Sequence, residues 1–120
     1  MAILNSINQM LDEMKAWRQD LHKIPEIGLE EYETSKYIKN KLKEFNINYK
    51  DGYSKTGLIA WVKGNKGNSD KSIGLRADFD ALPMPEKNSF EHKSTNPGMM
   101  HACGHDGHTS MLLGAAKYLS

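Results

Sequence analysis

The segment that most constrains the fold is the apolar helix predicted over residues 109–119. Its hydrophobic side chains fall on most of its faces, and they are Met111, Leu112, Leu113, Ala115, Ala116, Tyr118 and Leu119. A helix of this kind is buried on several sides, here between a sheet and other elements. A buried helix that follows a strand ordinarily leads into a further parallel strand. The pattern therefore predicts part of a larger α/β domain.

Two amphipathic helices are predicted nearer the N-terminus. Apolar side chains recur there at steps of three and four residues, namely Ile3, Leu4, Ile7, Met10, Leu11, Met14, Trp17 and Leu21. This spacing predicts one helix that runs to about His22 and is ended by Pro25, because proline lacks an amide proton. A second helix is predicted from Glu30 to about Asn46, with glutamates in its first turn and lysines toward its end, as the helix dipole favours.

Three short strands are predicted between the second and the last helix. Residues 47–53 indicate a strand that ends in a turn at Asp51-Gly52, and residues 57–64 indicate a stronger strand between two glycines. After a polar loop, residues 72–78 are predicted as a third, central strand. Residues 82–96 hold two prolines and no sustained period, so they are interpreted as an irregular excursion over the candidate site. The order of elements predicts an α/β fold.

The charge balance argues against two classes of partner. Sixteen basic and fifteen acidic side chains are interspersed and give a formal charge of +1, so neither nucleic acid nor an anionic membrane is an expected partner. No apolar run reaches the length of a membrane span, and the N-terminus lacks the pattern of a secretory signal. A single cysteine cannot form an internal disulfide, which leaves the cytoplasm as the expected compartment.

The run His101-Ala-Cys-Gly-His-Asp-Gly-His108 concentrates candidate metal ligands. Imidazole nitrogen and thiolate sulfur are the usual ligands of zinc and similar ions. If residues 101–105 are extended, the side chains of His101, Cys103 and His105 point to one side. The run therefore predicts a metal site.

Nearby aspartates can support such a site. Asp78, Asp80 or Asp106 can accept the second ring proton of a ligating histidine and hold its orientation. A metal ion lowers the pKa of its bound water toward neutrality, and it also acts as a Lewis acid on a carbonyl group. Amide hydrolysis is a reaction that uses both effects.

Other interpretations of these residues stay open. Asp106 can be a simple cap of the last helix, and Cys103 can be a small buried residue or a thiol nucleophile paired with a histidine, either His101 or His105. The Asp78 and Asp80 carboxylates can cap a turn before Pro83. The other two histidines carry weaker expectations: His22 complements a helix dipole, and His92 is an exposed loop residue.

Three runs resemble one known family. They are Arg18–Gly28, Gly74–Pro83 and Glu91–His108, and they resemble the metal-dependent aminoacylase and carboxypeptidase family. This family includes hippurate hydrolases, N-acyl-amino-acid amidohydrolases and auxin-conjugate amidohydrolases. The resemblance implies that residues 1–120 are the N-terminal portion of a three-layer α/β/α metallo-exopeptidase catalytic domain with a mixed sheet. The rest of that domain, and a smaller lid or dimerisation domain, lie outside this sequence.

The resemblance also implies a site and a reaction. Members use two divalent ions, such as manganese, zinc, nickel or cobalt. Cys103 and His105 match two metal ligands, and Asp80 matches an acidic residue that supports them. His101, Asp106 and His108 are expected to play supporting parts. Other branches of the wider family have a ligating histidine at the position of Asp78, so this chain resembles the cysteine-containing branch instead. Asp78 is expected there in a supporting part.

A small N-acyl-amino-acid or peptide-like substrate is implied, and the intact enzyme is expected to be a homodimer or larger. The general-base glutamate and the other ligands belong to a region beyond this sequence. The alternative is a non-catalytic metal-binding fragment or relic that is inactive without a complementing C-terminal part.

Overall fold

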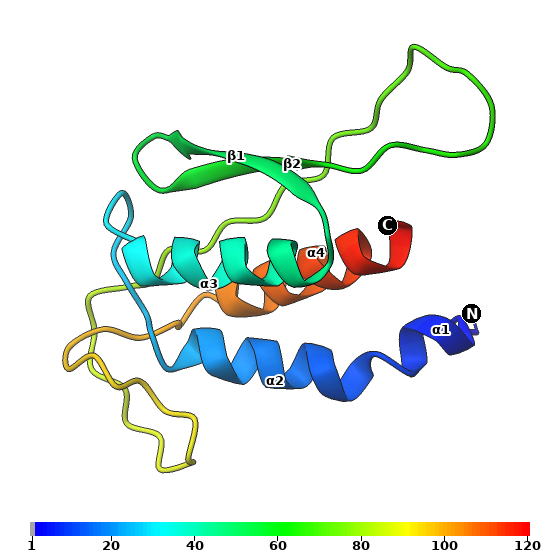
Figure 1. Cartoon of the computed structure of the whole chain (residues 1–120). Helices are drawn as coiled ribbons and strands as arrows, with labels where there is room; N and C mark the ends of the chain where they lie inside the picture. The colour runs from blue at the N-terminus through cyan, green and yellow to red at the C-terminus, as the bar shows by residue number, and fades with distance from the viewer. Residues whose placement is uncertain (1) are drawn as a thin grey trace.

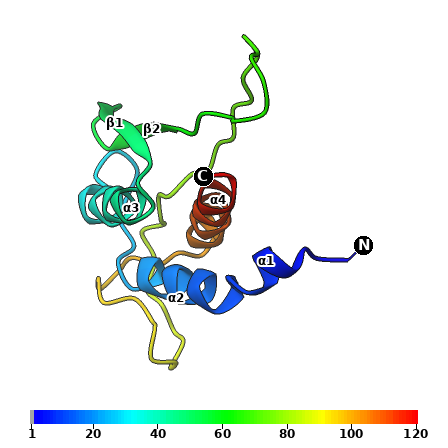
Figure 2. The same ribbon diagram turned by 45° about the vertical axis from the view of Figure 1, so that its right-hand side comes forward.

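Three long helices and one small sheet make up the fold. The computed structural model describes residues 2–120. Its elements are α1 (Asn5–Asn8), α2 (Leu11–His22), α3 (Tyr32–Glu44), β1 (Asn48–Tyr53), β2 (Gly57–Trp61) and α4 (His105–Leu119). The sheet covers one side of α3, and α2 and α4 pack against each other on the other side (Figure 1; Figure 2). No helix among residues 2–120 has the length and apolar character needed to cross a bilayer.

The first predicted helix is two helices. The chain breaks at Gln9 and Met10, where the Met10 amide bonds to the Ile7 carbonyl, three residues back, at 3.0 Å. No residue of α1 is buried, whereas α2 buries Trp17 and Leu21. Packing holds most helices in place. Because α1 contacts α4 but buries no residue, it is not held on the axis of α2. The single-helix prediction is therefore wrong at this point.

The second predicted helix is confirmed as α3, within two residues at each end. The Glu26 carboxylate accepts the free amide protons of Glu33 and Thr34 at 3.1 and 2.7 Å and so caps the helix. At the other end, Asn46 takes φ +56° and the Ile47 amide bonds back to the Leu42 carbonyl at 2.9 Å. This is the left-handed ending that asparagine and glycine favour.

The predicted strands at 47–53 and 57–64 are confirmed as β1 and β2, which pair antiparallel. The turn was predicted at Asp51-Gly52, but the chain reverses at Ser54 and Lys55, which have φ +46° and +74°. Gly52 instead lies at a bulge in β1 with φ +88°. Glycine with positive φ occurs in bulges as well as in turns. Gly52 therefore led to a turn being predicted at a position where the structure has a bulge.

The predicted third strand is wrong for this structure. Residues 72–78 belong to no sheet in the described chain, which contains only the two-stranded sheet of β1 and β2. Ile73 is 90% exposed and Leu75 is 60% exposed. A strand forms only where a neighbouring backbone supplies its hydrogen bonds, and no such neighbour lies beside this segment within residues 2–120.

The core lies between the helices and the start of the sheet. Its buried hydrophobic residues are Trp17, Ile38, Leu42, Ile47 and Leu113. On α4, Leu113 faces this core while Met111 and Leu119 are exposed, so the prediction of burial on most faces holds for only one side. The helix packs against α2 so closely that a Cβ on Gly114 would lie 2.7 Å from the Met14 side chain.

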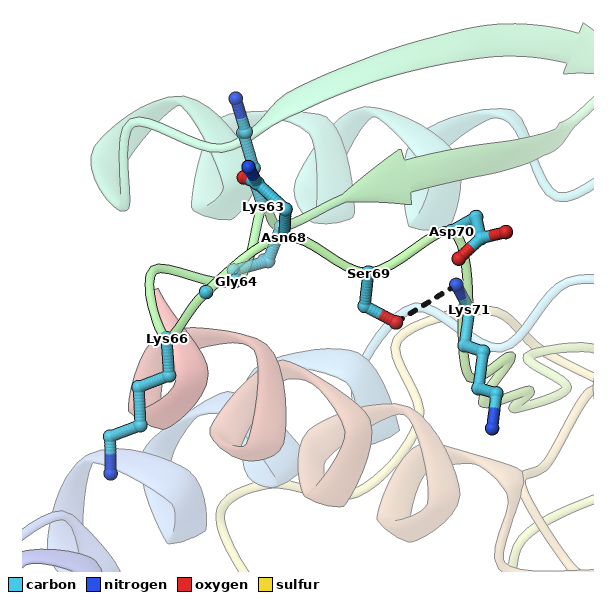
Figure 3. Close-up of a pocket in the computed structure, with 9 residues that line it drawn as sticks. Lys63, Gly64, Lys66, Asn68, Ser69, Asp70 and Lys71 are labelled. Atoms are coloured by element: carbon cyan, nitrogen blue, oxygen red, sulfur yellow. Dashed lines mark hydrogen bonds between the residues drawn. The ribbon is translucent and has the colours of Figure 1, made fainter.

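Residues 62–71 form an open loop away from the core. Figure 3 shows a shallow hollow there, lined among others by Lys63, Asn68 and Ser69, with the Lys71 amide donating to Ser69 Oγ at 3.1 Å. None of the residues of the 101–108 run lines it. The loop matches the predicted polar surface turn, and the candidate chemistry lies elsewhere.

Candidate metal centre

The centre is built at the first turn of α4. Gly104 precedes this helix with φ +82°, a conformation that glycine adopts without strain. His105 and His108 then stand three residues apart on the helix, a spacing that places them on one face. Their rings stack with centroids 5.5 Å apart.

Asp78 meets both histidines from the segment that precedes the long excursion. Its Oδ1 lies 2.7 Å from His108 Nδ1, and its Oδ2 lies 3.4 Å from His105 Nε2. Ligand atoms of these three residues all lie within 4.8 Å of one another. Two imidazoles and one carboxylate are ligands that zinc and related ions accept, so the donor set fits a divalent metal.

Asp80 orients His105 from behind. His105 Nδ1 lies 2.9 Å from Asp80 Oδ1 and 3.0 Å from the Asp80 carbonyl oxygen. Both acceptors require the ring proton on Nδ1, which leaves the Nε2 lone pair free toward Asp78. This carboxylate–histidine arrangement is typical of metal ligands, and through this contact Asp80 can orient the His105 ring.

The segment around Asp78 is tied to α4 by a second contact. Thr109 Oγ1 donates to the Asp78 carbonyl at 2.9 Å. The hydrogen bond from His108 is the largest influence on the Asp78 carboxyl and holds its pKa below the ordinary value, although burial opposes it. The carboxylate is therefore ionised and able to bind a cation near neutral pH.

The other residues of the run do not share one side. Cys103 is exposed, and its sulfur is outside the Asp78, His105 and His108 group. His101 is buried, neither of its ring nitrogens has a hydrogen-bond partner within residues 2–120, and burial lowers its pKa. Residues 101–104 do not form a strand, since the chain turns at Gly104 and the helix starts at His105, so the condition for three aligned side chains is not met.

Asp106 points away from the cluster into the protein. Its side chain is 1% exposed, and its Oδ1 accepts the Gly107 amide at 2.9 Å. Its Oδ2 lies 2.7 Å from His22 Nδ1, and His22 Nε2 lies 3.0 Å from Glu86. The sequence interpretation missed His22 and Glu86 as partners. The available signal was the position of His22 inside the first of the three runs that resemble the family.

Similarity to known proteins covers nearly the whole chain. The model of the family described as peptidase family M20/M25/M40 matches residues 74–120, which include every residue of the centre. A hippurate hydrolase of Campylobacter jejuni is 48% identical over 98% of this chain. The chain is therefore similar to one part of the enzymes of the M20/M25/M40 peptidase family.

Two further similar proteins agree with this match. An N-acyl-L-amino acid amidohydrolase of Geobacillus stearothermophilus is 43% identical over 95% of it. A crystal structure from Bacillus subtilis, described as a dinuclear metal binding peptidase from the M20 family, aligns with 93% of it at 40% identity and a TM-score of 0.85. The fold is therefore that of the matching part of an M20 peptidase domain. The chain spans only 31% of each of these two proteins and of the Campylobacter enzyme.

Gly104→Ala is expected to lower the free energy of unfolding by about 1 kcal/mol or more, because a Cβ is strained in the left-handed region. No atom lies within 4 Å of the added Cβ, so the loss would come from the backbone alone. Gly64→Ala is the matched control, with open space and no positive φ. Urea denaturation of both variants measures the difference. Equal effects would contradict the role given to Gly104.

Proposed function

We propose that this chain forms one wall of the metal centre of an amidohydrolase that cleaves N-acyl or aminoacyl amide bonds and releases an amino acid. The observation that carries the proposal is the convergence of Asp78, His105 and His108 with Asp80 behind His105. The names of the hippurate and N-acyl-L-amino acid hydrolases support the substrate class.

The residues of this chain would bind and orient. His105 and His108 would offer ring nitrogens, Asp78 would offer a carboxylate, and Asp80 would hold the His105 proton on Nδ1. A bound divalent ion would supply Lewis acidity and a water of lowered pKa. The general base is assigned to a region outside residues 1–120, as the family resemblance implies.

Two ions per site are proposed, and manganese, zinc, nickel or cobalt all suit a mixed set of nitrogen, oxygen and sulfur ligands. Cys103 remains a proposed ligand together with His105. Because Asp80 holds the Nδ1 proton of His105, only Nε2 can bind an ion. Cys103, exposed beside the turn at Gly104, would bind the same ion as His105, and Asp78 and His108 would hold the second. A small acyl-amino-acid substrate, a homodimeric or larger enzyme and a cytoplasmic location complete the proposal.

A chimera tests the function. In it, residues 1–120 would replace the matching 31% of the Campylobacter hippurate hydrolase. We expect metal-dependent hydrolysis of hippurate by the chimera and only trace turnover by residues 1–120 alone, because a general base contributes about a hundredfold or more. A folded, metal-loaded chimera without turnover would contradict the proposal and favour a non-catalytic metal-binding role. Robust turnover by residues 1–120 alone would contradict the assignment of the base elsewhere.

Cys103→Ala is expected to weaken the binding of the ion shared with His105 and to leave a second, cysteine-independent binding event at Asp78 and His108. The physical reason is that the Cys103 sulfur lies outside the group of Asp78, His105 and His108. Isothermal titration with Zn²⁺ measures both events, and Cys103→Ser is a control that keeps the size of the side chain but weakens the ligand. An unchanged titration of Cys103→Ala would remove Cys103 from the ligand set.

A further inference from the structure

We propose that His22 is a positioning residue that holds the first turn of α4, and thereby the metal-binding histidines on it, through its contact with Asp106. The inference rests on the proposed function. His22 ends α2, is far from the 101–108 run in sequence, and does not belong to the ligand group.

The contacts of His22 join two buried carboxylates. Nδ1 lies 2.7 Å from Asp106, and Nε2 lies 3.0 and 3.1 Å from the two oxygens of Glu86. The side chains of Asp106 and Glu86 are 1% and 3% exposed, and that of His22 is 12% exposed. A buried carboxylate that loses its partner is costly, so these contacts strongly constrain the residues that make them.

The Asp106 carboxylate has fewer other partners than the Glu86 carboxylate, so its position depends more on His22. Its Oδ2 has one other cationic neighbour, Arg18, whose Nε is 3.6 Å away and whose side chain is 59% exposed. Oδ1 binds only the adjacent Gly107 amide. Asp106 follows His105 directly and lies two residues before His108, so a shift of Asp106 would rotate both imidazoles.

Glu86 has other anchors on its own loop. It accepts the Ser94 amide at 2.8 Å and Asn88 Nδ2 at 3.2 Å. The same loop is fastened to the end of α2, where Thr95 donates to the Lys23 carbonyl and Asn96 donates to the Pro25 carbonyl. Loss of the Glu86 contact would therefore leave the loop in place. The contact of Nδ1 with Asp106 is therefore more important for the metal centre than the contact of Nε2 with Glu86.

Two substitutions of His22 remove the contacts of its two ring nitrogens separately. The amide nitrogen of asparagine lies about where Nδ1 lies, so His22→Asn can still donate to Asp106. The longer glutamine reaches the place of Nε2, so His22→Gln can contact Glu86 but leaves Asp106 without its near partner. If His22 only stabilised the fold, the two variants would have similar affinity for metal and similar amide exchange rates.

Titration of the chain with Zn²⁺ gives the first readout. We expect His22→Gln to weaken binding at the α4 cluster by about 10- to 100-fold, the usual effect of losing an outer partner of a metal ligand, and His22→Asn to stay within about threefold of wild type. Equal weakening in both variants, or no weakening in His22→Gln, would overturn the inference. If His22→Gln does not fold, as judged by circular dichroism, Asp106→Asn takes its place with the same expectation.

Hydrogen exchange of the metal-free chain gives a second, independent readout. The amides of Gly107 and His108 bond to the Gly104 carbonyl at 2.9 and 3.2 Å. They are expected to exchange faster in His22→Gln than in His22→Asn, and equal rates would overturn the inference. If wild type binds no Zn²⁺, the proposed function loses its metal centre, while the exchange rates still decide the role of His22.

Discussion

Trp17→Ala is expected to lower the free energy of unfolding by about 3–5 kcal/mol, the usual cost of removing a large buried aromatic side chain. Trp17 is 4% exposed and lies in the core with Ile38, Leu42 and Leu113. Its ring also meets that of Phe45, with centroids 5.4 Å apart. Because single domains are stable by only about 5–15 kcal/mol, the variant is expected to be largely unfolded at 37 °C.

The matched control is the other tryptophan, Trp61, at the end of β2. Trp61 is 48% exposed, so Trp61→Ala removes the same side chain from a position with far less buried surface. Its expected cost is under about 1 kcal/mol. Thermal unfolding followed by far-ultraviolet circular dichroism compares the two without relying on tryptophan fluorescence. Similar losses in both variants would mean that Trp17 is not central to the core.

His105→Ala is expected to weaken metal binding at the α4 cluster by more than about 100-fold, because loss of an outer partner alone costs about 10- to 100-fold. His105 is the residue on which the contacts converge: Asp80 holds its Nδ1, and its Nε2 faces Asp78 at 3.4 Å. Titration with Zn²⁺ and with Mn²⁺ measures the effect. In the chimera with the Campylobacter enzyme, the same substitution is expected to abolish metal-dependent hydrolysis.

His92→Ala is the control for that experiment. His92 stacks on Phe90 with ring centroids 4.0 Å apart, in the loop between Asp80 and the 101–108 run. It is outside the ligand group, and its edge contact with the His22 ring, with centroids 5.8 Å apart, makes no bond to Asp106. Its removal is therefore expected to change metal affinity by less than about threefold. Comparable losses from His92→Ala and His105→Ala would indicate that the histidines bind metal nonspecifically.

The helices and the two paired strands were predictable because their signals are local. Steps of three and four residues marked α2 and α3, and branched and aromatic residues marked β2. The segment 72–78 carries the same local signal, yet it forms no sheet here. Strand formation depends on a neighbour that is distant in sequence, and local composition carries no information about whether that neighbour is present.

The candidate site was predictable in its chemistry but not in its geometry. The density of histidines around Cys103 indicated a metal centre, and Asp80 was expected to support His105. The structure adds Asp78 and His108 to His105 and leaves the Cys103 sulfur outside that group. The reason is that α4 starts at His105, so that His105 and His108 lie one turn apart on the helix while Cys103 precedes it.

Residue types and their spacing thus predicted an α/β segment with candidate metal ligands around residues 78–80 and 101–108. Tertiary structure decided which of these side chains meet. It also joined His22 to Asp106 across 84 positions of sequence, a contact that no local pattern encodes. Helix periodicity and ligand type are properties of neighbouring residues, whereas contacts between distant side chains exist only after the helices have packed.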